Sequence, residues 1–402
     1  MGTILLLVRW ITGNALLSSE QSLVKFGILF AIILNCAYGT ALIFLSFFMK
    51  KINRSNMKNF FEESYSKLSG VANKRFIKIV CYFVQLELWI VQIVVLSTFY
   101  QIFFGSNGIY WTFITIGIMV VICYIASIKA TQSIALMYSI LLFVTLTIIP
   151  IYYFILNGST EVYEGIRLYH PYLLYFKDSS YVPFYIALFI IACCHVLVDL
   201  PTWYTISLIE KSKRSIALLI TGVIKILISF SLTAILLIAI YQGPFENIEM
   251  LLLSYLHIEE SNALNYLFAA FCLMSILAPL LVSVKSMQNL NNGDSNGLTI
   301  LFLIGILFSI IFVKSIHLLD IIIYFGLIYV ALMPLFVMFL FTSLKLPKNI
   351  YLYFISLVIF GQGLYYMSNN ILLTIFMQLL LGFLSYYFAY KQPNSLERAG
   401  KF

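Results

Sequence analysis

Three ionisable side chains stand inside long apolar stretches of the sequence, and their types suit the transfer of protons. Glu87 lies two residues after Gln85, and His195 precedes Asp199 by four residues. The second spacing places both side chains on one face of a helix. A carboxylate beside an imidazole favours the protonated ring, and a carboxyl group in an apolar environment readily keeps its proton. These residues are therefore candidates for proton exchange, and Glu87 is also a candidate for binding a cationic group of a solute.

Each of these residues also has an interpretation in which it only supports packing. Glu87 would then pair with Lys225 or Arg9, and the sequence leaves both interpretations of Glu87 open. Lys225 would otherwise neutralise Asp199 or extend its amine toward the cytoplasmic surface. Asp199 would cap a half-helix, although we favour a role for it in a functional helix break. For His195 we favour a polar core residue.

The composition places these residues in a membrane protein. Of the 402 residues, 62% are hydrophobic and 10% are charged, whereas soluble domains contain about 45–50% and about 25%. A soluble protein would expose far too much apolar surface, which excludes a soluble enzyme and a nucleic-acid binder. The sequence carries no phosphate-binding, metal-binding or nucleophile–base motif, so we expect no enzyme activity and no cofactor. Six cysteines in apolar runs are expected to pack: Cys36, Cys81, Cys123, Cys193, Cys194 and Cys272.

Hydropathy predicts about twelve membrane-spanning helices and therefore an all-α polytopic fold. The spans are expected near 2–22, 24–49, 76–104, 109–126, 132–156, 181–208, 215–241, 263–288, 298–314, 317–341, 350–367 and 371–390. Most of the 24 Lys and Arg residues then fall on the side of the N-terminus, and the loops on the other side are acidic. Because basic loops face the cytoplasm, we expect both termini to be cytoplasmic in the plasma membrane of a bacterium.

The connections between the spans suggest two five-helix blocks of opposite orientation. The amphipathic stretch 57–68 follows the second span on the inner side, and the stretch 245–256 follows the seventh span on the outer side. Five helices repeated in opposite orientation are typical of secondary transporters. We therefore expect one repeat over 1–157, a second over 158–342, and two additional helices with a tail over 343–402.

The first span of each block carries residues that interrupt a helix. The span 2–22 contains a Thr-Gly-Asn sequence and then the polar run 18–21, and the span 181–208 contains a proline at 201. Backbone groups freed at such breaks bind solutes and ions in transporters. The residues expected to bind the solute are Thr12, Gly13, Asn14, Gln85, Glu87, Cys194, His195 and Asp199.

Two parts of the chain resemble known transporter families. The stretch PTWYTISLIEKSKRSIALLITGVIKIL, with the later AAFCLMSILAPLLVSVKSMQNL, is similar to sodium:solute symporters. The stretches TGNALLSSEQSLVKFG and MKNFFEESYSKLSG resemble the bacterial YkvI-type family. Both resemblances imply the LeuT-type fold of the amino acid–polyamine–organocation superfamily, with five plus five inverted helices and two more. They also imply ion-coupled transport of a small organic solute such as an amino acid.

The resemblance implies a sodium site that this sequence only partly provides. In sodium:solute symporters, a serine pair in the span matching 263–288 holds Na+ together with carbonyls of the first span. The matching place reads Met274-Ser275-Ile276, so Ser275 is the one hydroxyl left. The candidate ion-coupling residues are Glu87, Asp199 and Ser275, and we favour H+ over Na+ with Glu87 as the carrier. The alternative is a LeuT-type protein that does not transport and instead senses a ligand or supports a membrane complex.

Overall fold

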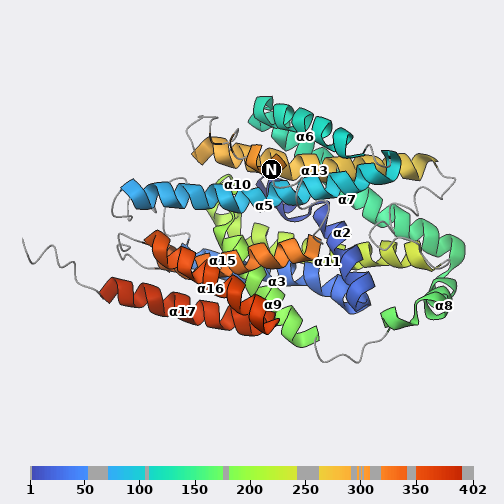
Figure 1. The fold of residues 1–402 in the computed structure, drawn as a ribbon. Helices are drawn as coiled ribbons and strands as arrows, with labels where there is room; N and C mark the ends of the chain where they lie inside the picture. Colours follow the sequence, from blue (N-terminus) through green and yellow to red (C-terminus); the bar gives the residue numbers. More distant parts are fainter. Residues whose placement is uncertain are drawn as a thin grey trace, which may run out of the picture.

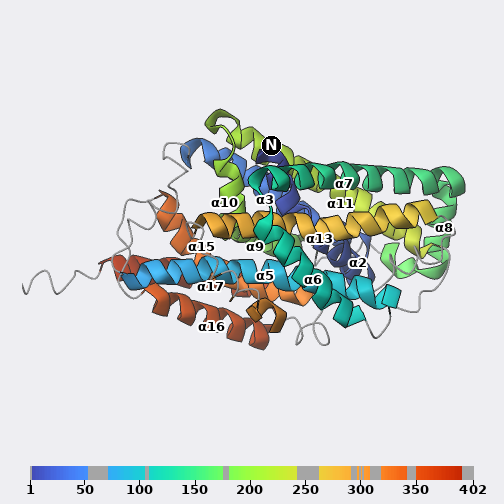
Figure 2. The ribbon, with the colours of Figure 1, turned by 90° about the horizontal axis from the view of Figure 1, so that it is seen from above.

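The computed structural model describes residues 2–52, 71–104, 108–174, 181–241, 262–290, 318–341 and 350–391, with a few positions between 297 and 307. Regular structure throughout these residues is helical. Eight helices in this part of the chain are long and apolar enough to cross a membrane. Most of the long helices run alongside one another in an elongated bundle (Figure 1), which Figure 2 shows from above.

The elements follow the chain in a simple order. The first half contains α1 (Gly2–Trp10), α2 (Asn14–Phe26), α3 (Ile28–Ile52), α5 (Val71–Phe104), α6 (Gly108–Ile125), α7 (Ile128–Asn157), α8 (Ser159–Tyr169) and η3 (Pro171–Leu174). The second half contains α9 (Tyr181–Val198), α10 (Leu200–Ser207), η4 (Lys211–Lys213), α11 (Arg214–Ile240), α13 (Asn262–Leu290), α15 (Leu318–Phe341), α16 (Ile350–Ser368) and α17 (Ile371–Lys391). These helices lie within a few residues of eleven of the expected spans. The span expected near 298–314 lies almost entirely outside the described residues, as do the amphipathic stretches 57–68 and 245–256.

Both expected helix breaks are present. The first span divides into α1 and α2 at residues 11–13, and the sixth divides into α9 and α10 at Asp199. The polar run 18–21 does not interrupt the helix, because α2 continues through it. Ser18, Ser19 and Glu20 of this run are buried, and Asn35 Nδ2 donates to Ser19 Oγ at 2.7 Å. Polar side chains with internal partners do not end a helix.

A short amphipathic helix, α8, lies between the fifth and sixth spans, where hydropathy predicted none. Its buried residues Val162 and Ile166 are one turn apart, and the exposed face carries Glu164 and Arg167, joined by an ion pair at 3.3 Å. A window long enough to find a membrane span averages these charges with the apolar residues. Hydropathy therefore identifies the spans and overlooks helices of this kind.

The buried interior is formed by the broken helices and by α5 and α15, whereas α6 presents apolar side chains outward. Most of α1 and of α10 is buried, and 83% of the α5 span is buried against 28% of the α6 span. Outward residues of α6 such as Ile118 and Ile125 are aliphatic and exposed, as the hydrocarbon of a bilayer requires. The broken helices are thus enclosed by others that can face lipid.

Helices α3 and α11 cross at two glycines. A Cβ atom on Gly222 would lie 2.6 Å from the carbonyl oxygen of Gly39, and one on Gly39 would lie 2.8 Å from that of Gly222. Small residues allow helix backbones to approach closely in membranes. Neither backbone can move away without separating the two helices.

We expect Gly222→Ala to destabilise the folded protein by about 1–3 kcal/mol, because the new methyl group would overlap a backbone oxygen. The measurement is thermal unfolding of the purified protein in detergent. Gly117→Ala in α6 is the matched control, because nothing lies within 4 Å of a Cβ atom there. That substitution should leave the stability unchanged or raise it by up to about 1 kcal/mol. Equal melting temperatures for the two variants would contradict the prediction.

Candidate functional site

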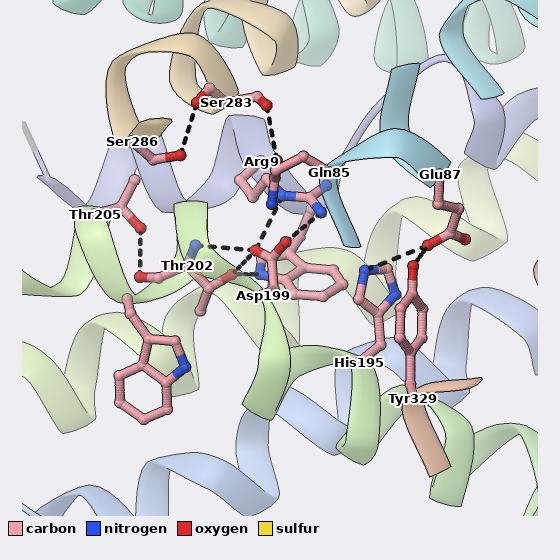
Figure 3. Close-up of polar contacts among 12 residues, drawn as sticks. Arg9, Gln85, Glu87, His195, Asp199, Thr202, Thr205, Ser283, Ser286 and Tyr329 are labelled. Atoms are coloured by element: carbon pink, nitrogen blue, oxygen red, sulfur yellow. Dashed lines mark hydrogen bonds and ion pairs between the residues drawn. The ribbon is translucent and has the colours of Figure 1, made fainter. Parts of the chain in front are cut away.

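The two helix breaks are joined by a buried ion pair between Arg9 and Asp199. Arg9 lies in the last turn of α1, and its Nη2 and Nε atoms donate to Asp199 Oδ1 and Oδ2 at 2.6 and 3.0 Å (Figure 3). Asp199 is fully buried and Arg9 is 4% exposed. Two parallel bonds between a guanidinium and a carboxylate fix the relative orientation as well as the distance of the groups. The ion pair therefore holds the end of α1 against the start of α10.

Asp199 is also the N-cap of α10. Its Oδ2 accepts bonds from the backbone amide and the hydroxyl of Thr202 at 2.9 and 2.6 Å. Pro201 lies in the first turn of α10, where a helix leaves amides without an intrahelical partner. Trp10 Nε1 donates to Thr202 Oγ1 at 2.9 Å, so α1 and α10 are linked by a second contact. Asp199 therefore caps α10, and both of its carboxylate oxygens accept hydrogen bonds.

His195 pairs with Glu87 rather than with Asp199. The Nε2 atom of His195 lies 3.7 Å from Glu87 Oε2, and its Nδ1 atom lies 3.3 Å from the hydroxyl of Tyr38. Tyr329 donates a hydrogen bond to Glu87 Oε2, and its ring stacks on His195 with 4.4 Å between centroids (Figure 3). His195 and Asp199 share no hydrogen bond or ion pair, because α9 ends at Val198 and Arg9 and Thr202 occupy the Asp199 carboxylate.

Glu87 does not pair with Lys225 or Arg9, which corrects the packing interpretation of this residue. The Lys225 amine donates instead to the carbonyl oxygen of Trp10 at 2.6 Å. Lys225 is 5% exposed, so its amine does not reach the membrane surface. Glu87 is likewise 5% exposed and is left with the Tyr329 hydroxyl and the His195 imidazole as partners.

A small cavity of about 50 Å³ lies at the helix breaks. This volume holds a few water molecules, since one needs at least about 10–15 Å³. Polar side chains from six helices and the first break line it: Arg9, Thr12, Asn14, Tyr38, Glu87, His195 and Lys225 are among them. Within this central cavity, the Thr12 hydroxyl donates to the Asn14 amide oxygen. Four of the eight expected solute-binding residues therefore share one cavity.

The other four expected solute-binding residues do not line the central cavity. Gln85 accepts a hydrogen bond from Ser283 Oγ at 2.7 Å, and Cys194 is buried in the hydrophobic core. Asp199 is engaged as described above. Gly13 packs on α13: its amide donates to the carbonyl oxygen of Ser275 at 3.4 Å. A Cβ atom on Gly13 would lie 2.6 Å from Ser275 Oγ, so only glycine fits at this approach.

Ser275 lies at the break of the first span, as the resemblance implied. Its hydroxyl donates to the carbonyl oxygen of Cys272 at 2.7 Å. Sequence reasoning missed Tyr38 and Tyr329, the two tyrosines that contact His195 and Glu87. Neither had a distinguishing signal among 28 tyrosines in apolar surroundings.

Comparison with known proteins places the fold. No family model and no curated protein matches the sequence. A solved structure of a Na+-coupled sialic acid symporter, bound to substrate in an outward-open state, matches with a TM-score of 0.69. The match covers 100% of this chain and 89% of that one at 13% sequence identity. The chain therefore has the expected all-α LeuT-type fold along its full length, and its structural neighbour is a transporter rather than an enzyme.

Proposed function

We propose that this chain is a secondary transporter that moves a small organic solute, such as an amino acid, across the plasma membrane. The central cavity carries this proposal, because both broken helices contribute ionisable and polar side chains to it. Discontinuous helices that meet at the middle of a bundle form the solute site of secondary transporters. With its small volume, the cavity corresponds to a closed conformation, and the solute enters when the half-helices move.

We further propose that the proton gradient drives this transport through Glu87. A buried carboxylate disfavours its charged form unless partners compensate. Here the partners are a tyrosine hydroxyl and an imidazole, both of which are neutral or can become so. Glu87 can therefore take up a proton when the cavity faces one side and release it on the other. Asp199 differs from it, because Arg9 stabilises its charged form in a bidentate pair.

The test is uptake of radiolabelled amino acids by liposomes containing the purified protein, with an inward proton gradient and no sodium. We expect accumulation well above that of protein-free liposomes, and a protonophore should abolish it because it removes the driving force. Uptake that requires sodium would contradict proton coupling. No uptake of any solute, together with thermal stabilisation by one of them, would instead support a ligand sensor.

A further inference from the structure

The C-terminal end of α1 carries a partial negative charge in the interior of the bundle. The last carbonyls of a helix have no intrahelical partner, and the aligned peptide dipoles give this end about half a negative charge. At the surface, water would satisfy such groups. Here Trp10 and Ile11 are 4% and 1% exposed, so bulk water does not reach these carbonyls, and their donors come from inside the bundle.

The chain itself supplies a donor to the carbonyls of residues 10–12 at this break. Lys225 on α11 donates to the Trp10 oxygen at 2.6 Å, and the Tyr138 hydroxyl on α7 donates to the Ile11 oxygen at 2.7 Å. The Thr12 oxygen accepts from the Ala15 amide at 3.0 Å. The three consecutive carbonyls therefore each have an internal partner, and two of the donors come from distant helices.

Lys225 supplies the side-chain amine among these donors. Within the described residues, no carboxylate lies within ion-pair distance of its amine. A buried ammonium without a carboxylate is costly, and the dipole at the end of α1 is the compensation that its hydrogen bond indicates. Arg9 in the same region uses its charge on Asp199 and is therefore not available to the carbonyls.

We propose that Lys225 is a resident cation of the helix break, and that its ammonium does at the end of α1 what a bound metal cation would otherwise do. Ser275 completes the argument, because its hydroxyl donates to the Cys272 carbonyl and its own carbonyl accepts from Gly13. The carbonyl oxygens of Trp10, Ile11, Thr12, Cys272 and Ser275 therefore each already accept a hydrogen bond. We infer that this chain needs no Na+ to hold the break. What this inference implies for transport rests on the proposed function, whereas the role of Lys225 in holding the helix break does not.

The test is thermal unfolding of the purified protein in sodium chloride, methylammonium chloride and choline chloride at equal ionic strength. The parent protein should melt within about 1 °C in all three salts, because its cation is covalently attached. Lys225→Ala should melt a few degrees lower in choline chloride, since a buried carbonyl loses its partner. Sodium or methylammonium should recover at least half of that loss, whereas choline is too large to enter. Lys285→Ala, which removes an amine bonded to Gln288 and Tyr124 near the inner end of α13, should not respond to the salt.

Two outcomes would overturn the inference. One is a parent protein that Na+ stabilises by several degrees relative to choline, which would mean that a metal ion is still required. The other is a Lys225→Ala loss that neither small cation reduces, which would leave the amine as a hydrogen-bond donor only. If Lys225→Ala does not fold, Lys225→Arg and Lys225→Met are compared, and equal stability of these two overturns the inference. None of these measurements requires transport, so their failure is distinct from failure of the proposed function.

Discussion

Asp199→Ala is expected to destabilise the folded protein by about 3–5 kcal/mol, because it leaves the Arg9 guanidinium buried without a counter-charge. The same substitution removes the N-cap of α10, at a further cost of about 1 kcal/mol. We expect the variant to lose solute uptake as well, since α1 and α10 would no longer be held together at the breaks. Denaturation of the purified protein in detergent measures the first effect, and uptake by liposomes measures the second.

The double variant Arg9→Ala/Asp199→Ala is the control for the charge. Removing both partners removes the stranded cation, so the double variant should be more stable than Asp199→Ala alone. Asp199→Asn should fall between the parent and Asp199→Ala, because an amide oxygen can still accept from the Thr202 amide. If Asp199→Ala were as stable as the parent, the Arg9–Asp199 pair would not hold the half-helices.

Glu87→Gln is expected to reduce uptake driven by the proton gradient at least tenfold, because an amide cannot carry the proton. The shape of the side chain is almost unchanged, and its oxygen can still accept from Tyr329, so the fold should persist. Downhill exchange of solute between the two sides of the liposome membrane should continue, because exchange needs no net proton movement. The measurement is uptake of an identified solute with and without the gradient.

Glu164→Gln is the matched control for Glu87→Gln. Glu164 lies on the exposed face of α8 and pairs only with Arg167 there, so uptake should equal that of the parent. A Glu87→Gln protein that still concentrates solute in response to the proton gradient would contradict the proposed role of Glu87. Loss of exchange together with loss of driven uptake would favour a structural role for this carboxyl group.

The sequence predicted the helix breaks because their signals are local. Gly13 and its polar neighbours interrupt an apolar run, and Pro201 removes an amide, so each break lies where its own residues place it. The polar run 18–21 stays helical, and Ser19 there is bonded by Asn35 of the neighbouring helix α3. A sequence pattern shows that a residue is polar, but whether its partner is within the helix or across the bundle depends on packing.

The pairing of the ionisable residues could not be predicted for the same reason. Arg9 and Asp199 are 190 residues apart, and Tyr329 and Glu87 are 242 apart. Hydropathy identifies the helices that carry these residues. It does not determine how each helix is rotated about its own axis, and therefore which side chains face each other. Lys225 illustrates the consequence: two partners and the membrane surface were plausible for its amine, and the partner is a backbone carbonyl that no sequence pattern marks.

The Arg9–Asp199 pair has a consequence for how the protein responds to the membrane potential. An elementary charge moved across the whole membrane does electrical work of about 2.3 kcal/mol per 100 mV. The guanidinium and the carboxylate lie side by side in one bidentate contact and together present no net charge to that field. The half-helices α1 and α10 can therefore change position without electrical work from this pair. Voltage dependence of the movement would then originate in other charged groups, and the described part of the chain buries several more, including Glu20, Glu87 and Lys225.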